Sequence, residues 1–123
     1  MEKEIVRAFV GAGHSDLDKT RSMLDEHPRV LNAVVDHGNG DFEAAIGGAG
    51  HMGRRDIAQF LIDRGARFDI FVAAMMGKLE IVKAAIEAFP SAKNSLGPHG
   101  IDLLTHAEKG KSTNVIEYLQ SLG

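Results

Sequence analysis

Cysteine and tryptophan are absent from this chain, and tyrosine occurs only once. Without cysteine the chain can form no disulfide, no thiolate metal site and no cysteine nucleophile, which fits a reducing compartment. Aromatic residues make up only 6% of the 123 residues. Alanine, isoleucine, leucine and valine must therefore supply most of the core, and such small apolar side chains suit helices that pack closely together.

Long hydrophobic runs and an excess of positive charge are missing as well. The longest apolar run, 70–76, is far too short to span a bilayer. The first four residues, Met1-Glu2-Lys3-Glu4, contain no apolar signal region. The formal net charge is −3, so no broad basic surface is available for nucleic acid. We therefore expect a cytoplasmic protein that engages neither a membrane nor a nucleic acid.

Helical periodicity is the main positive signal. Apolar residues recur at helical spacing in the segments 57–64, 81–89 and 115–119. Ser15-Asp16-Leu17-Asp18 resembles a capping box, and Gly65 occupies the place of a left-handed residue after a helix. Pro28 and Pro90 follow helical segments that they cannot continue. No alternating strand is convincing, and the short pair Val34-Val35 is interpreted as the edge of a loop.

Three segments repeat one another. In 49–62 and 73–86, a pair of small residues, a glycine and an apolar run keep the same spacing, and 106–119 follows them with a slip of about one residue. Gly77 and Gly110 lie 33 positions apart (110 − 77). This distance is the period of ankyrin repeats.

The units resemble the ankyrin pattern G-x-T-P-L-H-x-A-A-x-x-G-H followed by V-V-x-L-L-L-x-x-G-A. Arg64-Gly65-Ala66 matches its closing x-G-A, and 9–28 is a weaker first copy. The resemblance covers nearly the whole chain. It implies an all-α solenoid of stacked helix–turn–helix repeats with no substantial sheet. We expect a single domain, 1–123, with approximate repeats 3–40, 41–65, 66–98 and 99–123.

The chain departs from that family in two ways. No copy carries T-P-L-H, so apolar packing must replace the hydrogen bonds that the Thr and His of this motif make in the family. The spacing is also uneven, because Gly53 and Gly77 lie only 24 positions apart (77 − 53). About nine residues, roughly the projecting finger of that repeat, are missing there. The finger between the first two copies is longer, occupying 29–42 with its tip at 36–41.

The resemblance implies a non-catalytic protein–protein interaction module that binds an unknown protein partner on its concave face. Carried over residue by residue, the variable positions of that face are Glu43, His51, Met52, Arg67, Met75, Met76, Glu108 and Lys109. Our hypothesis is an apolar strip of the three methionines, since flexible Met side chains suit adaptable surfaces, with a polar rim around it. In the alternative interpretation, the missing finger shifts the packing and buries Met75, Met76 or both.

A second interpretation is a ligand-binding protein or an enzyme. The segment 48–53 matches the dinucleotide fingerprint G-x-G-x-x-G, with His51 nearby. That fingerprint requires a preceding strand and a crossover to a second strand. The preceding residues 43–47 are instead interpreted as the first turn of an inner helix, and the repeat itself needs small residues at these positions.

The remaining polar residues suggest no chemistry by their spacing. No two of the histidines lie four positions apart on one helix, so we expect no metal site; these are His14, His27, His37, His51, His99 and His106. His99, between Pro98 and Gly100, is placed in a turn, and no serine lies in a G-x-S-x-G elbow. We therefore expect no catalytic residue and no cofactor. A self-associating subunit is the third interpretation; otherwise the chain is a monomer.

Overall fold

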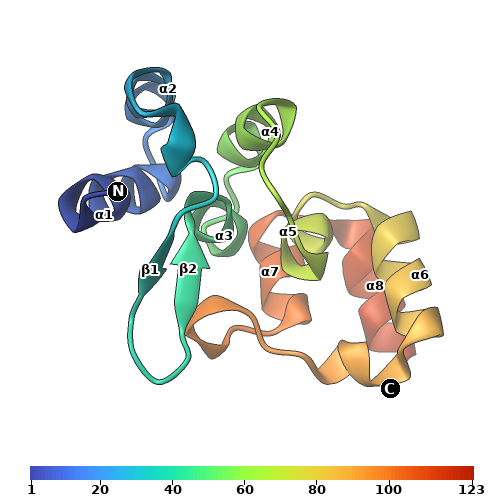
Figure 1. Cartoon of the computed structure of the whole chain (residues 1–123). Helices are drawn as coiled ribbons and strands as arrows, with labels where there is room; N and C mark the ends of the chain where they lie inside the picture. The colour runs from blue at the N-terminus through green and yellow to red at the C-terminus, as the bar shows by residue number, and fades with distance from the viewer.

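The computed structural model describes residues 1–123 and contains eight α helices and one two-stranded hairpin (Figure 1). The helices are α1 (Lys3–Gly13), α2 (Leu17–Glu26), α3 (Ala45–His51), α4 (Arg55–Asp63), α5 (Ile70–Met75), α6 (Leu79–Ala88), α7 (Leu103–Lys109) and α8 (Thr113–Ser121). Three short 3-10 helices, η1 (Pro28–Val30), η2 (Pro90–Asn94) and η3 (Pro98–Gly100), connect them. The strands are β1 (Val34–Asp36) and β2 (Phe42–Ala44). None of the eight helices has the length and hydrophobicity that a membrane-spanning segment requires.

The helices form four consecutive pairs, each joined by a tight turn. Helix α1 packs on α2, α3 on α4, α5 on α6 and α7 on α8. The first helices of the pairs also pack on one another in chain order, from α1 through α3 and α5 to α7. Among the second helices, α2 packs on α4 and α6 packs on α8 (Figure 1). The first helices therefore form a row that runs through the molecule.

Aspartate side chains begin three of the helices. Asp16 accepts a hydrogen bond from the backbone N–H of Lys19, and Asp69 accepts one from Val72. Asp102 accepts one from Thr105 at 2.8 Å. Each carboxylate satisfies a backbone donor that has no partner within its helix. Helix α2 is therefore capped by Asp16 and not by Ser15, which corrects the expected capping box by one residue.

Two apolar clusters make up the core. The first is built around Phe9, Leu24, Ile57, Leu61 and Met75, which lie between the first three helix pairs. The second joins the last two pairs, with Phe71, Val82, Ile86, Leu103 and Val115 among its members. Ala49, Ala74 and Ala107 are fully buried along the row of first helices. These small side chains let neighbouring helices approach closely, as the composition suggests.

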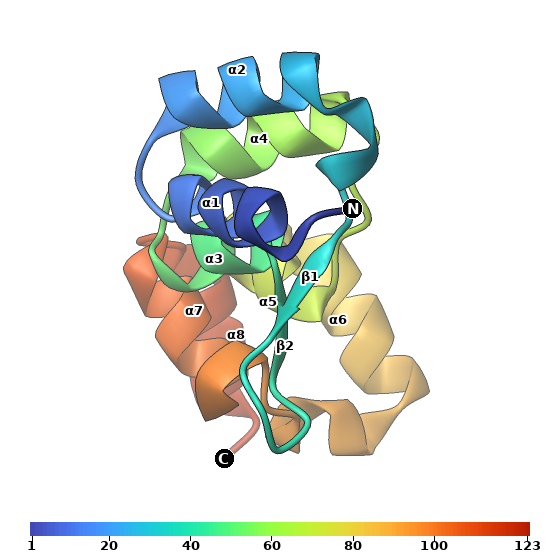
Figure 2. The ribbon, with the colours of Figure 1, turned by 60° about the vertical axis from the view of Figure 1, so that its left-hand side comes forward.

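The segment expected as a long finger forms η1 and a β hairpin. Strand β1 pairs antiparallel with β2, with Val35 opposite Glu43. The interpretation of Val34-Val35 as a loop edge is therefore wrong, because two strands of three residues are too short to show alternation in the sequence. The chain reverses through Gly38, Asn39 and Gly40, all with positive φ. The hairpin extends away from α2 and α4 (Figure 2).

Candidate metal centre

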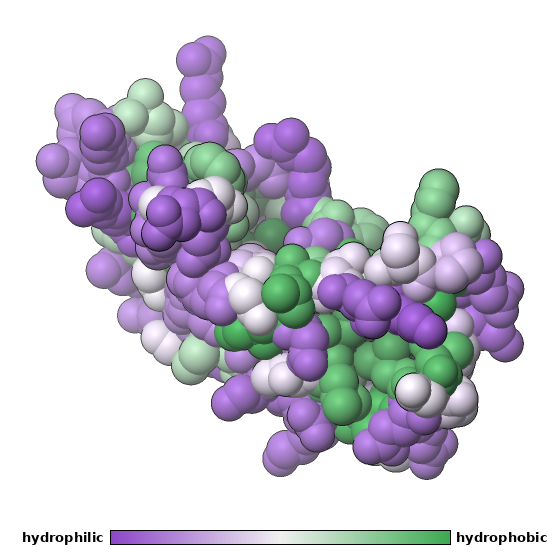
Figure 3. Space-filling model, turned by 90° about the horizontal axis from the view of Figure 1, so that it is seen from below, coloured by the Kyte–Doolittle hydropathy of each residue, from purple (hydrophilic) through white to green (hydrophobic).

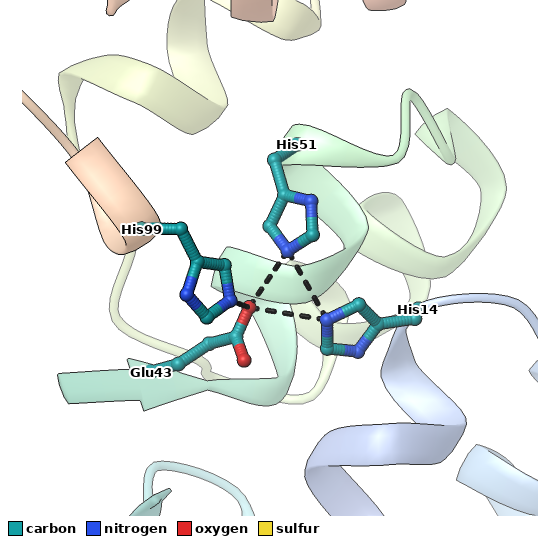
Figure 4. A group of neighbouring side chains, drawn as sticks. All are labelled: His14, Glu43, His51 and His99. Carbon is teal, nitrogen blue, oxygen red and sulfur yellow. Dashed lines mark hydrogen bonds and ion pairs between the residues drawn. The ribbon is translucent and has the colours of Figure 1, made fainter. Parts of the chain in front are cut away.

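Four side chains from separate segments point toward one another at the end of the first helices (Figure 4). His14 directly follows α1, Glu43 lies at the centre of β2, His51 is the last residue of α3 and His99 lies in η3. Each offers one nitrogen or oxygen atom, and these four atoms all lie within 4.8 Å of one another. We call these four residues the histidine–glutamate cluster.

Glu43 lies at the middle of this cluster. Its Oε2 atom is 2.8 Å from Nε2 of His51 and 3.1 Å from Nε2 of His14. The same oxygen is 3.2 Å from Nε2 of His99. The Nε2 atoms of His14 and His51 are themselves only 3.1 Å apart. Three imidazole nitrogens therefore converge on one carboxylate oxygen.

The cluster is buried on one side and reaches solvent on the other. The side chain of Glu43 is 1% exposed and that of His51 is 11% exposed, whereas His14 is 23% and His99 is 36% exposed. A buried carboxylate is costly unless its oxygen atoms are paired and hydrogen-bonded. Here the histidines provide that pairing, and the exposed edges of His14 and His99 leave a route for a small ion to enter.

Two identical tetrapeptides place two of the histidines. Gly11-Ala12-Gly13-His14 ends α1, and Gly48-Ala49-Gly50-His51 ends α3. The glycines make room for the site, because a Cβ atom added at Gly48 would lie 2.5 Å from the ring of His14. Both histidines thus lie at helix C-termini, where the partial negative charge of the backbone favours a cation.

His99 is held in an uncommon backbone conformation. Its φ of 61° is in the left-handed region, which residues other than glycine rarely adopt. Asp41, in the hairpin loop, fixes it from two directions. The backbone N–H of His99 donates to Oδ1 of Asp41 at 2.9 Å, and its ring Nδ1 donates to Oδ2 at 2.8 Å. The backbone bond in particular lowers the pKa of Asp41, so this carboxylate remains charged and keeps Nε2 of His99 directed at the cluster.

Hydrogen bonds to groups outside the cluster also set the orientation of His14 and Glu43. Nδ1 of His14 lies 2.8 Å from the carbonyl oxygen of Val10. Since a carbonyl only accepts, Nδ1 carries a proton, and Nε2 is the nitrogen that faces Glu43 and His51. A metal ion would take the place of any proton on Nε2. His37 lies 3.0 Å from the second oxygen of Glu43, Oε1, through its Nε2 atom. Outer partners of this kind are typical of metal-binding histidines and carboxylates.

The surroundings shift the pKa values of the cluster. Burial alone would raise the pKa of Glu43, but hydrogen bonds from His14, His37 and His51 outweigh it and lower the pKa to about 2. The hydrogen bond to Glu43 raises the pKa of His14. Burial lowers the pKa of His51, which favours the neutral imidazole that a metal requires. At neutral pH the carboxylate is therefore ionised.

The four donor groups are of the kinds that can hold a divalent metal ion. Three imidazole nitrogens and one carboxylate oxygen are ligands that Zn²⁺ and similar divalent metals accept. In a tetrahedral site with metal–ligand bonds of about 2.0–2.1 Å, ligand atoms lie about 3.3 Å apart. The closest of the four atoms are 2.8 to 3.2 Å apart, and all four lie within 4.8 Å of one another. Binding would therefore require the closest atoms to separate slightly and the most distant ones to approach. The ion would also separate the nitrogens of His14 and His51, which cannot both direct a proton into the same space.

Two of the eight residues expected at a binding face lie in the histidine–glutamate cluster. Glu43 and His51 belong to the cluster. Met75 is fully buried and packs in the first core cluster, so the strip of three methionines does not form and Met75 follows the alternative interpretation. Met52 is 48% exposed and Met76 is partly exposed. Arg67, Glu108 and Lys109 are exposed and lie outside the cluster.

The glycine-rich segment is not a dinucleotide loop. Gly48 and Gly50 lie inside α3 and are buried. The preceding strand, β2, pairs antiparallel with β1 and has no crossover to a parallel strand, so the context that the fingerprint requires is missing. The glycines instead let neighbouring helices and the ring of His14 approach α3.

The spacing rule for histidines missed the cluster, because that rule detects only ligands on a single helix. His14, His51 and His99 come from three segments that meet only after folding. The repeated Gly-Ala-Gly-His, with its histidines 37 positions apart (51 − 14), was the available signal. It places two histidines at equivalent ends of adjacent helices. His99 does lie in a turn, as expected, but no local pattern connects it with Glu43.

Comparisons with known proteins add no family. No family model matches the chain, and no curated protein matches it either.

Proposed function

We propose that this chain is a zinc-binding helical-repeat domain, in which His14, Glu43, His51 and His99 hold one divalent metal ion. The observation that carries this proposal is the convergence of three imidazole nitrogens and one carboxylate oxygen within 4.8 Å. The two outer carboxylate–histidine pairs, Asp41 with His99 and His37 with Glu43, support it further. The three histidines would supply neutral nitrogen ligands, and Glu43 would supply the negative charge.

The role that fits this ligand set is structural. Four protein ligands complete a tetrahedral shell and leave no position for a substrate, whereas catalytic zinc sites keep one open. The ligands come from α1, β2, α3 and η3, so the ion would tie the hairpin and the loop 96–102 to the row of first helices. This arrangement favours a non-catalytic protein over an enzyme.

We further propose that the four helix pairs form an ankyrin-like solenoid with an interaction surface. The regular packing of the first helices in chain order supports the solenoid. The exposed side chains of Met52 and Arg67, with Glu108 and Lys109, favour a protein-binding face as a second function. Met75 is excluded from that face by its burial.

The metal content of the purified chain tests the zinc proposal. Protein saturated with Zn²⁺ and then freed of excess metal should retain one zinc per chain, and Co²⁺ in its place should give the intense visible absorption of a tetrahedral site. His51→Ala should lose both signals. His27→Ala is the matched control, because His27 lies outside the cluster and its imidazole pairs with Glu26. Retention of the same zinc content by His51→Ala would refute the site.

A further inference from the structure

A cleft lies directly beside the histidine–glutamate cluster. It has a volume of about 740 Å³ and runs between the hairpin loop and the loop that carries η3. Residues 37–42 form one wall, 96–100 form the other, and Asp69 and Phe71 lie between them. His37 and His99 line the cleft and also contact Glu43, so the cleft and the cluster share a wall. We call this cavity the hairpin cleft.

Apolar side chains of the hairpin cleft are unusually exposed. Phe42 is 55% exposed on the first wall, and Leu96 is 65% exposed on the second. Phe71 is nearly buried and packs beneath Gly97, where an added Cβ atom would lie 3.0 Å from its ring. Seen from the side of the hairpin tip, hydrophobic residues gather mainly over the centre and the right, which is the side of the C-terminal helices, among hydrophilic ones (Figure 3). At the cleft itself, Phe42 and Leu96 are the exposed apolar side chains. Exposed apolar groups gathered at a cavity are typical of binding sites.

Apart from the two histidines and the zinc ion proposed at His99, the charged groups of the cleft have one sign. Its only aspartates, glutamates, lysines or arginines are two aspartates, Asp41 and Asp69. Asp41 is bound to His99 and Asp69 caps α5, so both carboxylates are fixed at the wall. A cationic ligand complements such a surface, whereas an anionic ligand would be repelled.

The hairpin loop also offers backbone groups to a ligand. The N–H groups of Asn39 and Gly40 donate to no protein group. Both residues are exposed, so these N–H groups are accessible to a ligand. Gly38, Gly40 and Gly100 leave the backbone bare on both walls. An extended peptide can hydrogen-bond to such groups while its side chains enter the cleft.

We propose that the hairpin cleft docks an extended peptide segment of a partner protein, in which a lysine or arginine neighbours a large apolar side chain. The apolar side chain would lie between Phe42 and Leu96, and the basic group would face Asp69 and Asp41. The proposal rests on the proposed zinc site, since His99 is a zinc ligand and part of the cleft wall. Zinc would hold the two walls at their separation and so strengthen docking.

Selection from a displayed library of random heptapeptides on the zinc-loaded chain tests this proposal. We expect enrichment of peptides that combine a basic and a large apolar residue. The selected peptide should bind the Leu96→Ser and Asp69→Asn variants about tenfold more weakly, and Asp69→Asn keeps a side chain able to cap α5. Val34→Ser is the control, because Val34 is 49% exposed but lies outside the cleft, and it should bind normally.

The outcomes distinguish failure of the docking proposal from failure of the zinc proposal. If no peptide is enriched, if acidic peptides are enriched, or if Leu96→Ser and Asp69→Asn bind as tightly as the original chain, the docking proposal is overturned, whatever the zinc content. If the selected peptide binds and both variants weaken it while no zinc is retained, the cleft stands and the metal site fails. If removal of the retained zinc with a chelator weakens peptide binding, the result supports both the zinc site and the docking proposal. If peptide binding is unchanged, zinc does not strengthen docking, and that part of the proposal is overturned.

Discussion

Glu43 contacts four histidines with its two carboxylate oxygens, one to His37 and the other to His14, His51 and His99. No sequence pattern singled it out for this role. It was expected at a binding face because of its place in the repeat, and its side chain is instead almost completely buried. A buried carboxylate is stable only where partners of opposite charge or hydrogen-bond donors surround it. The position of Glu43 therefore follows from the histidines that three other segments bring to it.

Two substitutions at His99 separate the effect of backbone strain on stability from the effect of the imidazole on metal binding. The φ of 61° at His99 costs an alanine about 1–2 kcal/mol but costs a glycine little. We therefore expect His99→Gly to be more stable than His99→Ala by about 1 kcal/mol in urea unfolding. Both variants lack the imidazole and should bind zinc at least tenfold more weakly. Equal stability of the two would show that the left-handed conformation is not maintained in solution.

At the scale of the element, the sequence predicts helices better than it predicts the strands of the hairpin. Helices α4, α6 and α8 give clear signals in the sequence, since apolar periodicity and turn residues act locally. The hairpin gives none, because strands of three residues depend on partners across the turn. The sequence does not decide whether Met75 is buried, since its burial depends on how α5 packs against its neighbours. Local physics thus predicted the helices, whereas tertiary contacts decided the hairpin and the site.

Helix α7 depends on its N-cap, Asp102. Asp102→Ala should lower the free energy of unfolding by about 0.5–2 kcal/mol, because the N–H of Thr105 loses its acceptor. The bonds from Thr105 also lower the pKa of Asp102 below its ordinary value of 3.8. A depressed carboxyl pKa stabilises the folded state above the ordinary value, and this stabilisation is lost as the pH falls below it. Urea unfolding at pH 7 and pH 3 should therefore show a smaller difference between variant and original chain at pH 3. A constant difference would contradict this account.

The position of the His14 ring against α3 depends on Gly48. A methyl group there would collide with the ring of His14, so Gly48→Ala should displace this ligand and weaken zinc binding at least tenfold. Gly11→Ala is the matched control, because Gly11 is also helical and an added Cβ atom would meet nothing within 4 Å. The control should bind zinc normally and gain up to about 1 kcal/mol in stability. Calorimetric zinc titration of both variants measures the contrast, and equal affinities would contradict the geometry.

At the scale of the whole molecule, the cluster joins the first two helix pairs to the loop before α7. A ligand that binds only the folded state stabilises it by about 4.1 kcal/mol at a thousandfold excess over Kd. Zinc should therefore raise the Tm of the original chain by several degrees and leave His51→Ala unchanged. Thermal unfolding followed by circular dichroism, with and without chelator, measures this. Destabilisation of the original chain by zinc would indicate binding to the unfolded state instead.

The coordination of the bound metal tests the central claim most directly. X-ray absorption spectroscopy of the zinc-loaded chain reports the number and type of atoms around the ion. We expect three imidazole nitrogens and one carboxylate oxygen at about 2.0–2.1 Å, with one imidazole fewer in His99→Ala. A shell dominated by water oxygens, or the same shell in the variant, would contradict the assignment of His14, Glu43, His51 and His99 as the ligands.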